Sequence, residues 1–228
     1  MRIKQIEKVD TLLIVNKITY EKLSILFFYT GSVMYDDIAQ HFCNTRIYQW
    51  NWVKKYLESL EKKSIVYDIG CGNGRNMECQ GIQFLGVDNC KNFLSICRSK
   101  NLNVLEADMT DIPLRDNSAD AIICIAAFHH LKTHDSRVKT MSEFKRLIVP
   151  GGSILLSIWS KIQPEKTRRT FDHYGDTLVP WNKYGKVYQR YYYIFKIEEL
   201  KKIIVDCGLI ISDHFYDCGN EVFLLLNP

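Results

Sequence analysis

Short apolar runs rich in β-branched residues alternate along this chain with longer stretches in which apolar residues recur at helical spacing. The apolar runs predict strands at residues 64–69, 83–88, 103–108, 119–126 and 153–159. Helical spacing predicts helices at residues 35–42, 50–60, 92–100, 137–147 and 198–207, with one further short helix soon after residue 74. Strands and helices that alternate through short connections predict a mainly parallel sheet with helices on both faces.

The end of the chain departs from this alternation. Two apolar runs, 210–216 and 221–226, follow the last expected helix and are separated only by Asp217-Cys218-Gly219-Asn220. A short connection of this composition is typical of a hairpin. The pattern therefore predicts an α/β fold whose seven-stranded, mainly parallel sheet ends in an antiparallel hairpin.

A glycine-rich loop, Asp68-Ile69-Gly70-Cys71-Gly72-Asn73-Gly74, directly follows the first expected strand. Glycines allow the backbone to turn sharply and to approach a ligand closely. The spacing Asp-x-Gly-x-Gly-x-Gly differs from the Gly-x-Gly-x-x-Gly of dinucleotide enzymes. Because its leading acid suits a cationic amino-acid tail rather than a pyrophosphate, the loop indicates S-adenosylmethionine as the cofactor.

Two further acids stand at the ends of the next two expected strands. Asp88 lies 20 residues beyond Asp68, where a carboxylate can accept the ribose hydroxyls. Asp108 is placed to receive the adenine amino group, with Met109 beside it to pack against the ring. Asn89 is either a second ribose contact or a turn residue. The predicted cofactor-binding residues are Asp68, Gly70, Cys71, Gly72, Gly74, Asp88, Asn89, Asp108, Met109 and Ala126.

Composition adds mild constraints to this interpretation. The chain of 228 residues has a net charge of +4 and 46% hydrophobic residues, which is ordinary for a soluble globular protein with one core. Its eight cysteines form no CxxC pair and no Cys/His ladder. We therefore predict no disulfide, no metal site and a reduced intracellular protein, located in the cytoplasm or also in the nucleus.

The N-terminal segment, residues 1–32, is predicted to be an extension outside the main domain, which spans residues 33–228. Its apolar stretch, 12–29, is interrupted by Lys17, Glu21 and Lys22, so we predict no membrane span. Within the main domain, residues 160–195 form an insertion after the fifth expected strand. Because it lies over the carboxyl ends of the strands, we expect this insertion to face the substrate.

The segment Ile125-Ala126-Ala127-Phe128-His129-His130 bears on the methyl acceptor. It stands where the Asn/Asp-Pro-Pro-Tyr signature would serve an amide or exocyclic-amine acceptor. A carboxylate acceptor is already ionised at neutral pH and needs orienting donors such as histidine or arginine rather than a base. Of the two adjacent histidines, we expect His130 to face the acceptor and His129 to pack.

The sequence resembles the class I S-adenosylmethionine-dependent methyltransferases, and among them the eukaryotic tRNA wobble-uridine carboxymethyl methyltransferases. This family esterifies 5-carboxymethyluridine in anticodon loops. The resemblance rests on the glycine loop and on selective stretches at Val33–Arg46 with Trp50, Ile125–His130 with Arg137-Val138, Trp159, Val179-Pro180-Trp181, and Gln189–Phe195 before Glu199-Leu200. It spans residues 33 to about 200. The first 30 residues have no family counterpart, and the loop from Ser160 to Val187 is shorter than in longer family members.

The resemblance implies that methyl transfer gives the ester of the wobble uridine, with His130, Arg46 and Arg137 orienting the acceptor. Trp181 and Tyr191 would hold the base. The substrate and RNA contacts that we predict are Trp159, Arg168, Arg169, Trp181, Arg190 and Tyr191. The implied partners are a tRNA anticodon loop and a small zinc-binding methyltransferase activator protein, which would cover apolar surface near the edge strand at 103–107 and form a heterodimer.

Basic and aromatic residues are interleaved between the fifth strand and the last helix. Their mixture suits RNA, because cations contact phosphates and rings stack on unpaired bases, although a solvated charged loop is a common alternative. They are Lys161, Lys166, Arg168, Arg169, Lys183, Lys186 and Arg190, with Phe171, Tyr174, Trp181, Tyr184, Tyr188 and Tyr191.

Two other functions fit parts of the pattern. A small-molecule methyltransferase would require an enclosing apolar lid, and the basic insertion argues against it. A catalytically silent subunit that keeps the fold to bind a partner is disfavoured by the complete set of the glycine loop, Asp88 and Asp108.

Overall fold

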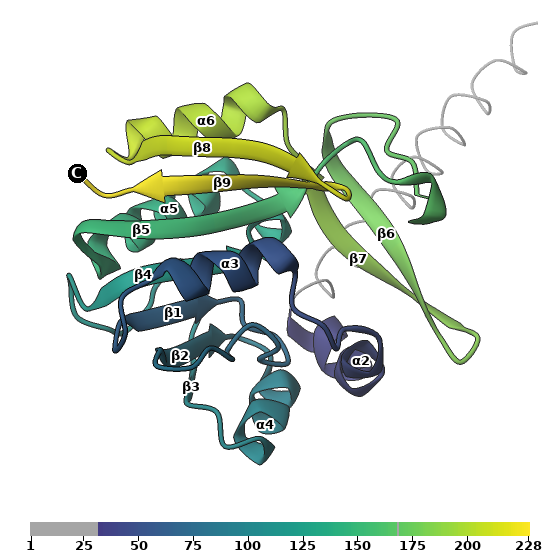
Figure 1. The fold of residues 1–228 in the computed structure, drawn as a ribbon. Helices are drawn as coiled ribbons and strands as arrows, with labels where there is room; N and C mark the ends of the chain where they lie inside the picture. The colour runs from purple at the N-terminus through teal and green to yellow at the C-terminus, as the bar shows by residue number, and fades with distance from the viewer. Residues whose placement is uncertain (1–31, 168) are drawn as a thin grey trace, which may run out of the picture.

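The computed structural model describes residues 32–167 and 169–228, so residues 1–31 of the predicted extension at 1–32, and Arg168, lie outside the described residues. Seven strands form one twisted sheet in the order β3-β2-β1-β4-β5-β9-β8 (Figure 1). They are β1 (Ile65–Ile69), β2 (Gln83–Asp88), β3 (Val104–Glu106), β4 (Ala119–Ile125), β5 (Ile148–Trp159), β8 (Ile210–Asp217) and β9 (Asn220–Leu226). The pairs among β1 to β5 are parallel, whereas β9 is antiparallel to both β5 and β8. The predicted mainly parallel sheet with a terminal hairpin is confirmed.

Helices cover both faces of the sheet because each strand alternates its side chains between two apolar layers. On one face, α3 (Asn51–Ser59) packs Val53 and Leu57 against β1 and β4, and α4 (Lys91–Ser99) packs beside it over β2 and β3. On the other face, α5 (His134–Leu147) and α6 (Ile197–Asp206) bury Phe144 and Ile204 in the largest core cluster. The remaining helix, α2 (Ser32–Thr45), lies beyond the carboxyl ends of the strands and contacts α4.

The short helix expected after the glycine loop is absent, and residues 75–82 form turns instead. Eight residues join Gly74 to Gln83, which starts β2 at the opposite end of the sheet. A helix of that length would advance only about 12 Å, whereas a strand of five or six residues is about 17–20 Å long. The connection must therefore be more extended than a helix.

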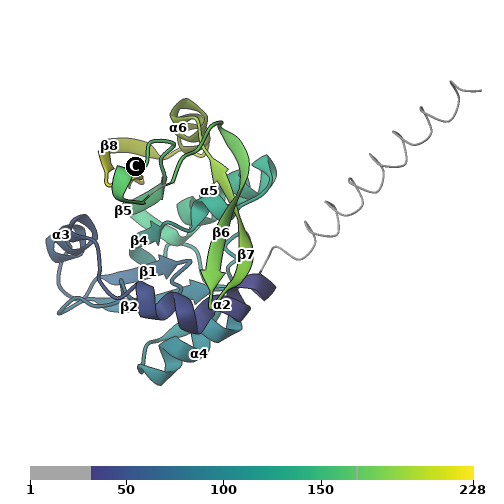
Figure 2. The same cartoon turned by 90° about the vertical axis from the view of Figure 1, so that its right-hand side faces the viewer.

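The insertion at 160–195 contains a hairpin that the sequence analysis did not predict. Its strands are β6 (Gly175–Lys183) and β7 (Lys186–Ile194), which pair antiparallel as a separate two-stranded sheet. Tyr184 and Gly185, both with positive φ, form the turn, as a two-residue hairpin loop requires. Figure 2 shows this hairpin crossing the carboxyl ends of the strands, with its tip near α2.

Trp181 fixes the hairpin to α2. It is 9% exposed, its Nε1 donates to His41 Nδ1 at 3.1 Å, and its ring lies 5.6 Å from that of Phe42. The buried positions Val179 and Trp181 alternate with exposed Pro180 and Asn182, which is the strand period that the loop prediction overlooked. Trp181 is thus a packing residue of the hairpin and not a wall of the cavity described below, contrary to the role expected for it.

Arg137 is likewise placed away from the cavity, in contrast to the acceptor-binding role expected from the resemblance. Its guanidinium is 3% exposed and lies 3.3 Å from the ring centroid of Tyr193. Nε and Nη2 donate to the carbonyls of Leu131 and Lys132, and Nη1 is 3.5 Å from Glu199 Oε1. These partners occupy its donors, so Arg137 ties α5 to α6 and to the segment that follows β4.

We predict that Arg137→Ala lowers the free energy of unfolding by about 2–4 kcal/mol, because it removes a buried side chain, its hydrogen bonds to the part-buried Leu131 and Lys132 carbonyls, and the counter-charge of Glu199. Chemical denaturation would measure the loss, with Lys139→Ala on the exposed side of the same helix as the control. A variant with unchanged stability that had lost only acceptor binding would restore the catalytic assignment.

Candidate active site

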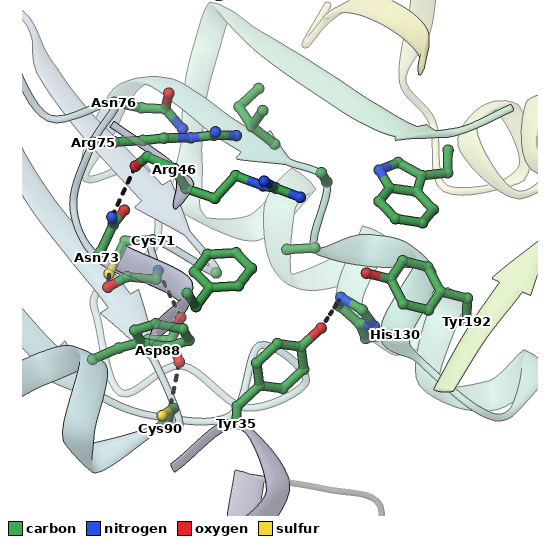
Figure 3. Close-up of a pocket in the computed structure, with 18 of the residues that line it drawn as sticks. Tyr35, Arg46, Cys71, Asn73, Arg75, Asn76, Asp88, Cys90, His130 and Tyr192 are labelled. Atoms are coloured by element: carbon green, nitrogen blue, oxygen red, sulfur yellow. Dashed lines mark hydrogen bonds between the residues drawn. The ribbon is translucent and has the colours of Figure 1, made fainter. Parts of the chain in front are cut away.

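A cavity of about 900 Å³ opens at the carboxyl ends of β1, β2 and β4. Its wall combines the glycine loop, the ends of the central strands, the C-terminal part of α2 with residues 46–50, and β7 from the hairpin. Figure 3 shows side chains from these segments converging on one space. The cavity has one half built around the glycine loop and another built around His130 and the hairpin.

The backbone of the glycine loop has the sharp turn that the sequence predicted. Gly70 has φ +77°, and a Cβ built there would lie 2.4 Å from the Cβ of Ala127. Gly72 has φ +54°, and a Cβ there would meet no atom within 4 Å, so its position borders open space. Both glycines are therefore required, Gly70 for close packing and Gly72 for a left-handed backbone beside the cavity.

Asp88 is held rigidly at the end of β2. Its Oδ2 accepts from the Gly72 N–H at 2.8 Å, and its Oδ1 accepts from the Cys90 N–H at 2.9 Å. Burial raises the pKa of this carboxyl, and the backbone donors oppose the shift. Each oxygen keeps a second lone pair, so the carboxylate can accept a pair of hydroxyls such as those of a ribose.

Asp108, Met109 and Asn89 line the same half of the cavity. Asp108 Oδ1 accepts from both the N–H and the hydroxyl of Thr110, at 2.9 and 2.7 Å, which fixes the direction of the carboxylate. The exposed carboxylate with a thioether beside it can receive an amino group on a flat aromatic ring. This is the arrangement expected for adenine.

Asp68, which precedes the glycine loop and does not line the cavity, is the least satisfied polar group next to this half. Its side chain is 0% exposed, and neither carboxylate oxygen has a hydrogen-bond partner among the described residues. Burial raises its pKa to about 7, an effect that Arg75 opposes and Asp88 reinforces. A buried carboxylate without a donor fits a ligand that brings its own cation, such as the ammonium of S-adenosylmethionine.

In the other half, His130 is fixed in one tautomer. Its Nδ1 lies 2.7 Å from the Tyr191 carbonyl oxygen, which can only accept, so Nδ1 carries the proton. Its Nε2 therefore accepts from the Tyr35 hydroxyl at 3.0 Å (Figure 3). Burial lowers the pKa of His130 to about 4, so the ring is neutral at physiological pH. Burial also raises the pKa of Tyr35, which remains a hydroxyl donor.

A stack of rings forms the wall behind His130. Trp159 and Tyr192 are stacked at 4.4 Å between centroids, and Tyr192 is stacked on His129 at 4.7 Å. Arg190 lies 1% exposed behind them and donates to the Tyr192 hydroxyl at 2.8 Å. His129 is fully buried and packs, as expected, whereas Arg190 positions the wall from behind instead of contacting a substrate.

The structure brings most of the predicted site residues to the cavity. Those that line it are Arg46, Gly70, Cys71, Gly72, Asp88, Asn89, Asp108, Met109, Ala126, His130, Trp159, Arg169 and Tyr191. Those that do not line it are Asp68, Gly74, Arg137, Trp181 and Arg190. Tyr35, Arg75 and Tyr192 line the cavity but were not predicted, although each stands within or next to a stretch that carried the family resemblance.

Among the described residues, no group of His, Cys, Asp and Glu side chains could hold a metal ion. No helix in the same part of the chain is long and apolar enough to cross a membrane. All eight cysteines are free thiols.

The raised pKa of Asp68 predicts a pH-dependent stability of the ligand-free protein. Since the carboxyl titrates near 3.9 when unfolded and at about 7 when folded, stability falls as pH rises between these values. Asp68→Asn should remove this fall and stabilise the ligand-free protein at pH 8, by at most about 4 kcal/mol. Thermal unfolding between pH 4 and pH 8 would measure it. At pH 4 the wild type and Asp68→Asn should differ little in stability. If the stabilities of the two proteins changed in parallel up to pH 8, the buried, unpaired carboxylate would be contradicted.

Comparison with known proteins agrees with this geometry. A family model described as "Methyltransferase domain" matches residues 67–156. The tRNA (carboxymethyluridine(34)-5-O)-methyltransferase of Schizosaccharomyces pombe is 31% identical over 210 residues, which cover 82% of this chain and 91% of that protein. The tRNA (carboxymethyluridine(34)-5-O)-methyltransferase alkbh8 of Xenopus tropicalis is 29% identical and covers 84% of this chain.

A solved complex between the Haloferax volcanii Trm112 methyltransferase activator and a methyltransferase contains a similar fold. Its TM-score is 0.61 at 16% identity, and the match covers 85% of this chain and 97% of that one. Several curated relatives are much longer, and the chain spans 40% of the Xenopus protein and 34% of an Arabidopsis thaliana relative. The sheet order, the glycine loop with its acids and the extended match to the fission-yeast protein agree, and the chain belongs to the tRNA (carboxymethyluridine(34)-5-O)-methyltransferase family of class I S-adenosylmethionine-dependent methyltransferases.

Proposed function

We propose that this chain transfers a methyl group from S-adenosylmethionine to the carboxylate of 5-carboxymethyluridine at the wobble position of tRNA, giving the methyl ester. The match to the fission-yeast relative over 91% of its length carries the proposal. The two-part cavity supports it, because the glycine-loop half suits the cofactor and the His130 half suits an acceptor.

A carboxylate acceptor agrees with the protonation states of the site. When bound, S-adenosylmethionine supplies a methyl group on a positively charged sulfur. A carboxylate oxygen forms the new C–O bond as the S–C bond breaks, so one negative and one positive charge disappear and no proton is released. Neutral His130 with its proton on Nδ1 is therefore not needed as a base, and it orients Tyr35 instead.

Arg46 and Tyr35 are the donors available to the acceptor. The Arg46 guanidinium donates to the Thr45 carbonyl and lies 5.5 Å from the ring centroid of Phe42. Burial lowers the pKa of Arg46, and no carboxylate among the described residues forms a salt bridge with it. A substrate carboxylate would supply that counter-charge and could accept two of its donors.

Aromatic side chains offer a surface for the base that carries this carboxylate. Trp159 lines the cavity, and the Arg169 guanidinium lies 4.5 Å from its ring centroid. An unstacked uridine can pack on such a ring and guanidinium. Lys166 also lines the cavity, and exposed Tyr184 and Lys186 lie at the hairpin tip, where they are available to neighbouring nucleotides and phosphates.

The β3 edge of the sheet is a candidate binding surface for a protein partner. β3 contains only Val104–Glu106, its two apolar residues are half-buried, and it is the outermost strand of the sheet. Such an edge invites another chain to cover it, and a methyltransferase of similar fold is solved with the Trm112 activator. We place the activator on this edge, in a heterodimer. The free thiols suit a cytoplasmic or nuclear location.

Labelled methyl transfer to tRNA containing 5-carboxymethyluridine tests the proposal. The full chain would be assayed with and without the activator protein, and the product treated with mild base. Label that enters the tRNA and leaves as methanol is the expected result. Base-stable label would indicate a nitrogen, carbon or ribose acceptor and overturn the ester. No incorporation by a chain that binds the cofactor would favour a small-molecule acceptor.

We expect Arg46→Ala to reduce methyl transfer at least about 100-fold, since it removes charge-assisted hydrogen bonds to the acceptor. Tyr35→Phe, which removes one hydroxyl donor, should cost about tenfold. Both variants should keep the wild-type affinity for S-adenosylmethionine, measured by calorimetry. Full turnover by Arg46→Ala would show that the acceptor is held by other residues.

A further inference from the structure

Arg75 lines the cavity but has no part in the proposed binding of the acceptor. It directly follows Gly74 and lines the same cavity as Arg46. Figure 3 shows the two side chains extending side by side into the cavity. Within the described residues, no hydrogen bond or salt bridge satisfies the Arg75 guanidinium, whereas Arg137 and Arg146 are paired with carboxylates.

The segments that carry the two arginines are fixed to each other. Asn73 Nδ2 donates to the Arg46 carbonyl at 3.0 Å, and Gln49 Nε2 donates to the Asn76 carbonyl at 3.1 Å. These bonds flank both arginines, so their backbones are held close together. The charges therefore cannot separate by moving the loops apart, and they are preorganised for an anion.

Within the part of the chain that the structure describes, Arg75 and the nearby Asp68 each lack a hydrogen-bonded partner of opposite charge. Burial lowers the pKa of Arg75, Arg46 lowers it further, and Asp68 opposes both effects. Asp68 is itself buried without a donor. A carboxyl with no donor thus lies within electrostatic reach of a guanidinium with no acceptor, next to the glycine loop.

A ligand that neutralises both the Asp68 carboxyl and the Arg75 guanidinium must carry a cation and an anion close together, as an α-amino acid does. We infer that Arg75 binds the α-carboxylate of the methionine part of S-adenosylmethionine while buried Asp68, behind the glycine loop, supplies the counter-charge for its ammonium, which leaves Arg46 for the acceptor. This inference rests on the proposed use of that cofactor. It gives the two neighbouring arginines different ligands, although both ligands are carboxylates.

The surroundings of each arginine support this division. The charges that act on Arg75 are Arg46, directly after α2, and Asp68, at the start of the glycine loop. Those that act on Arg46 are Tyr192, Arg190 and Tyr35, which belong to the His130 half of the cavity. Arg75 therefore faces the cofactor half, and Arg46 lies between the halves.

Decarboxylated S-adenosylmethionine provides a direct test, because it keeps the amine and the sulfonium and lacks only the carboxylate. Calorimetry would give the affinities of both ligands for the full-length wild type, Arg75→Leu, Arg75→Lys and Arg46→Leu. The wild type should prefer S-adenosylmethionine by about ten- to hundredfold, the range of a hydrogen bond between charged groups. Arg75→Leu should lose this preference by binding S-adenosylmethionine more weakly while keeping its affinity for the decarboxylated ligand. Arg75→Lys should keep part of the preference.

Other results would overturn the inference. If Arg75→Leu lost affinity equally for both ligands, Arg75 would have a structural role only. If Arg46→Leu lost the preference for S-adenosylmethionine over the decarboxylated ligand, the carboxylate would be assigned to Arg46. Either result would leave the proposed tRNA methylation intact, because that proposal is tested by label transfer. A wild type that binds neither ligand would overturn both proposals.

Discussion

The contact between Trp181 and the end of α2 is the constraint on which the site depends. Neither α2 nor the hairpin belongs to the sheet, yet α2 provides Tyr35 and β7 provides Tyr191 and Tyr192. The Trp181–His41 hydrogen bond and the packing of Trp181 on Phe42 hold these elements together. Without that contact, α2 and the hairpin, which supply the Tyr35 hydroxyl and the Tyr191 carbonyl to the two ring nitrogens of His130, would lose their direct link.

The chemistry of the cavity follows from how charge is distributed around it. At the glycine loop the fully buried carboxyl of Asp68 has no donor among the described residues, and guanidiniums without carboxylate partners lie nearby on Arg46 and Arg75. Aromatic rings and a neutral histidine make up the rest of the wall. Unpaired buried charge destabilises the protein alone, so this distribution is understandable only if the ligands complete it.

The sequence predicted the parts of the fold that depend on local pattern. The seven strands, mainly parallel and ending in an antiparallel hairpin, followed from apolar runs, and Asp88 and Asp108 were located because strand ends are visible in the sequence. The helix after Gly74 was predicted wrongly, since the distance back to β2 is a property of the whole sheet. The hairpin was missed because its alternation at Val179 and Trp181 is short and is interrupted by Pro180.

Individual side chains were harder to place than elements. Arg137, Arg190 and Trp181 belong to family-like stretches just as Arg46 and His130 do, and only packing shows that they support the site from behind. A stretch that builds a pocket contains both wall residues and the residues that hold the wall. Sequence alone does not distinguish wall residues from the residues that support them, because the same cavity constrains both kinds.

The fixed tautomer of His130 also bears on how the protein relates to bulk water. An enzyme that deprotonates its substrate must return that proton to solvent in each cycle, and therefore needs a wet path or an exposed base. Here the Tyr191 carbonyl and the Tyr35 hydroxyl engage both ring nitrogens, and in the proposed reaction an ester forms from a carboxylate without any proton to export. The aromatic wall can then stay dry throughout turnover, and the rate should be insensitive to solvent deuterium.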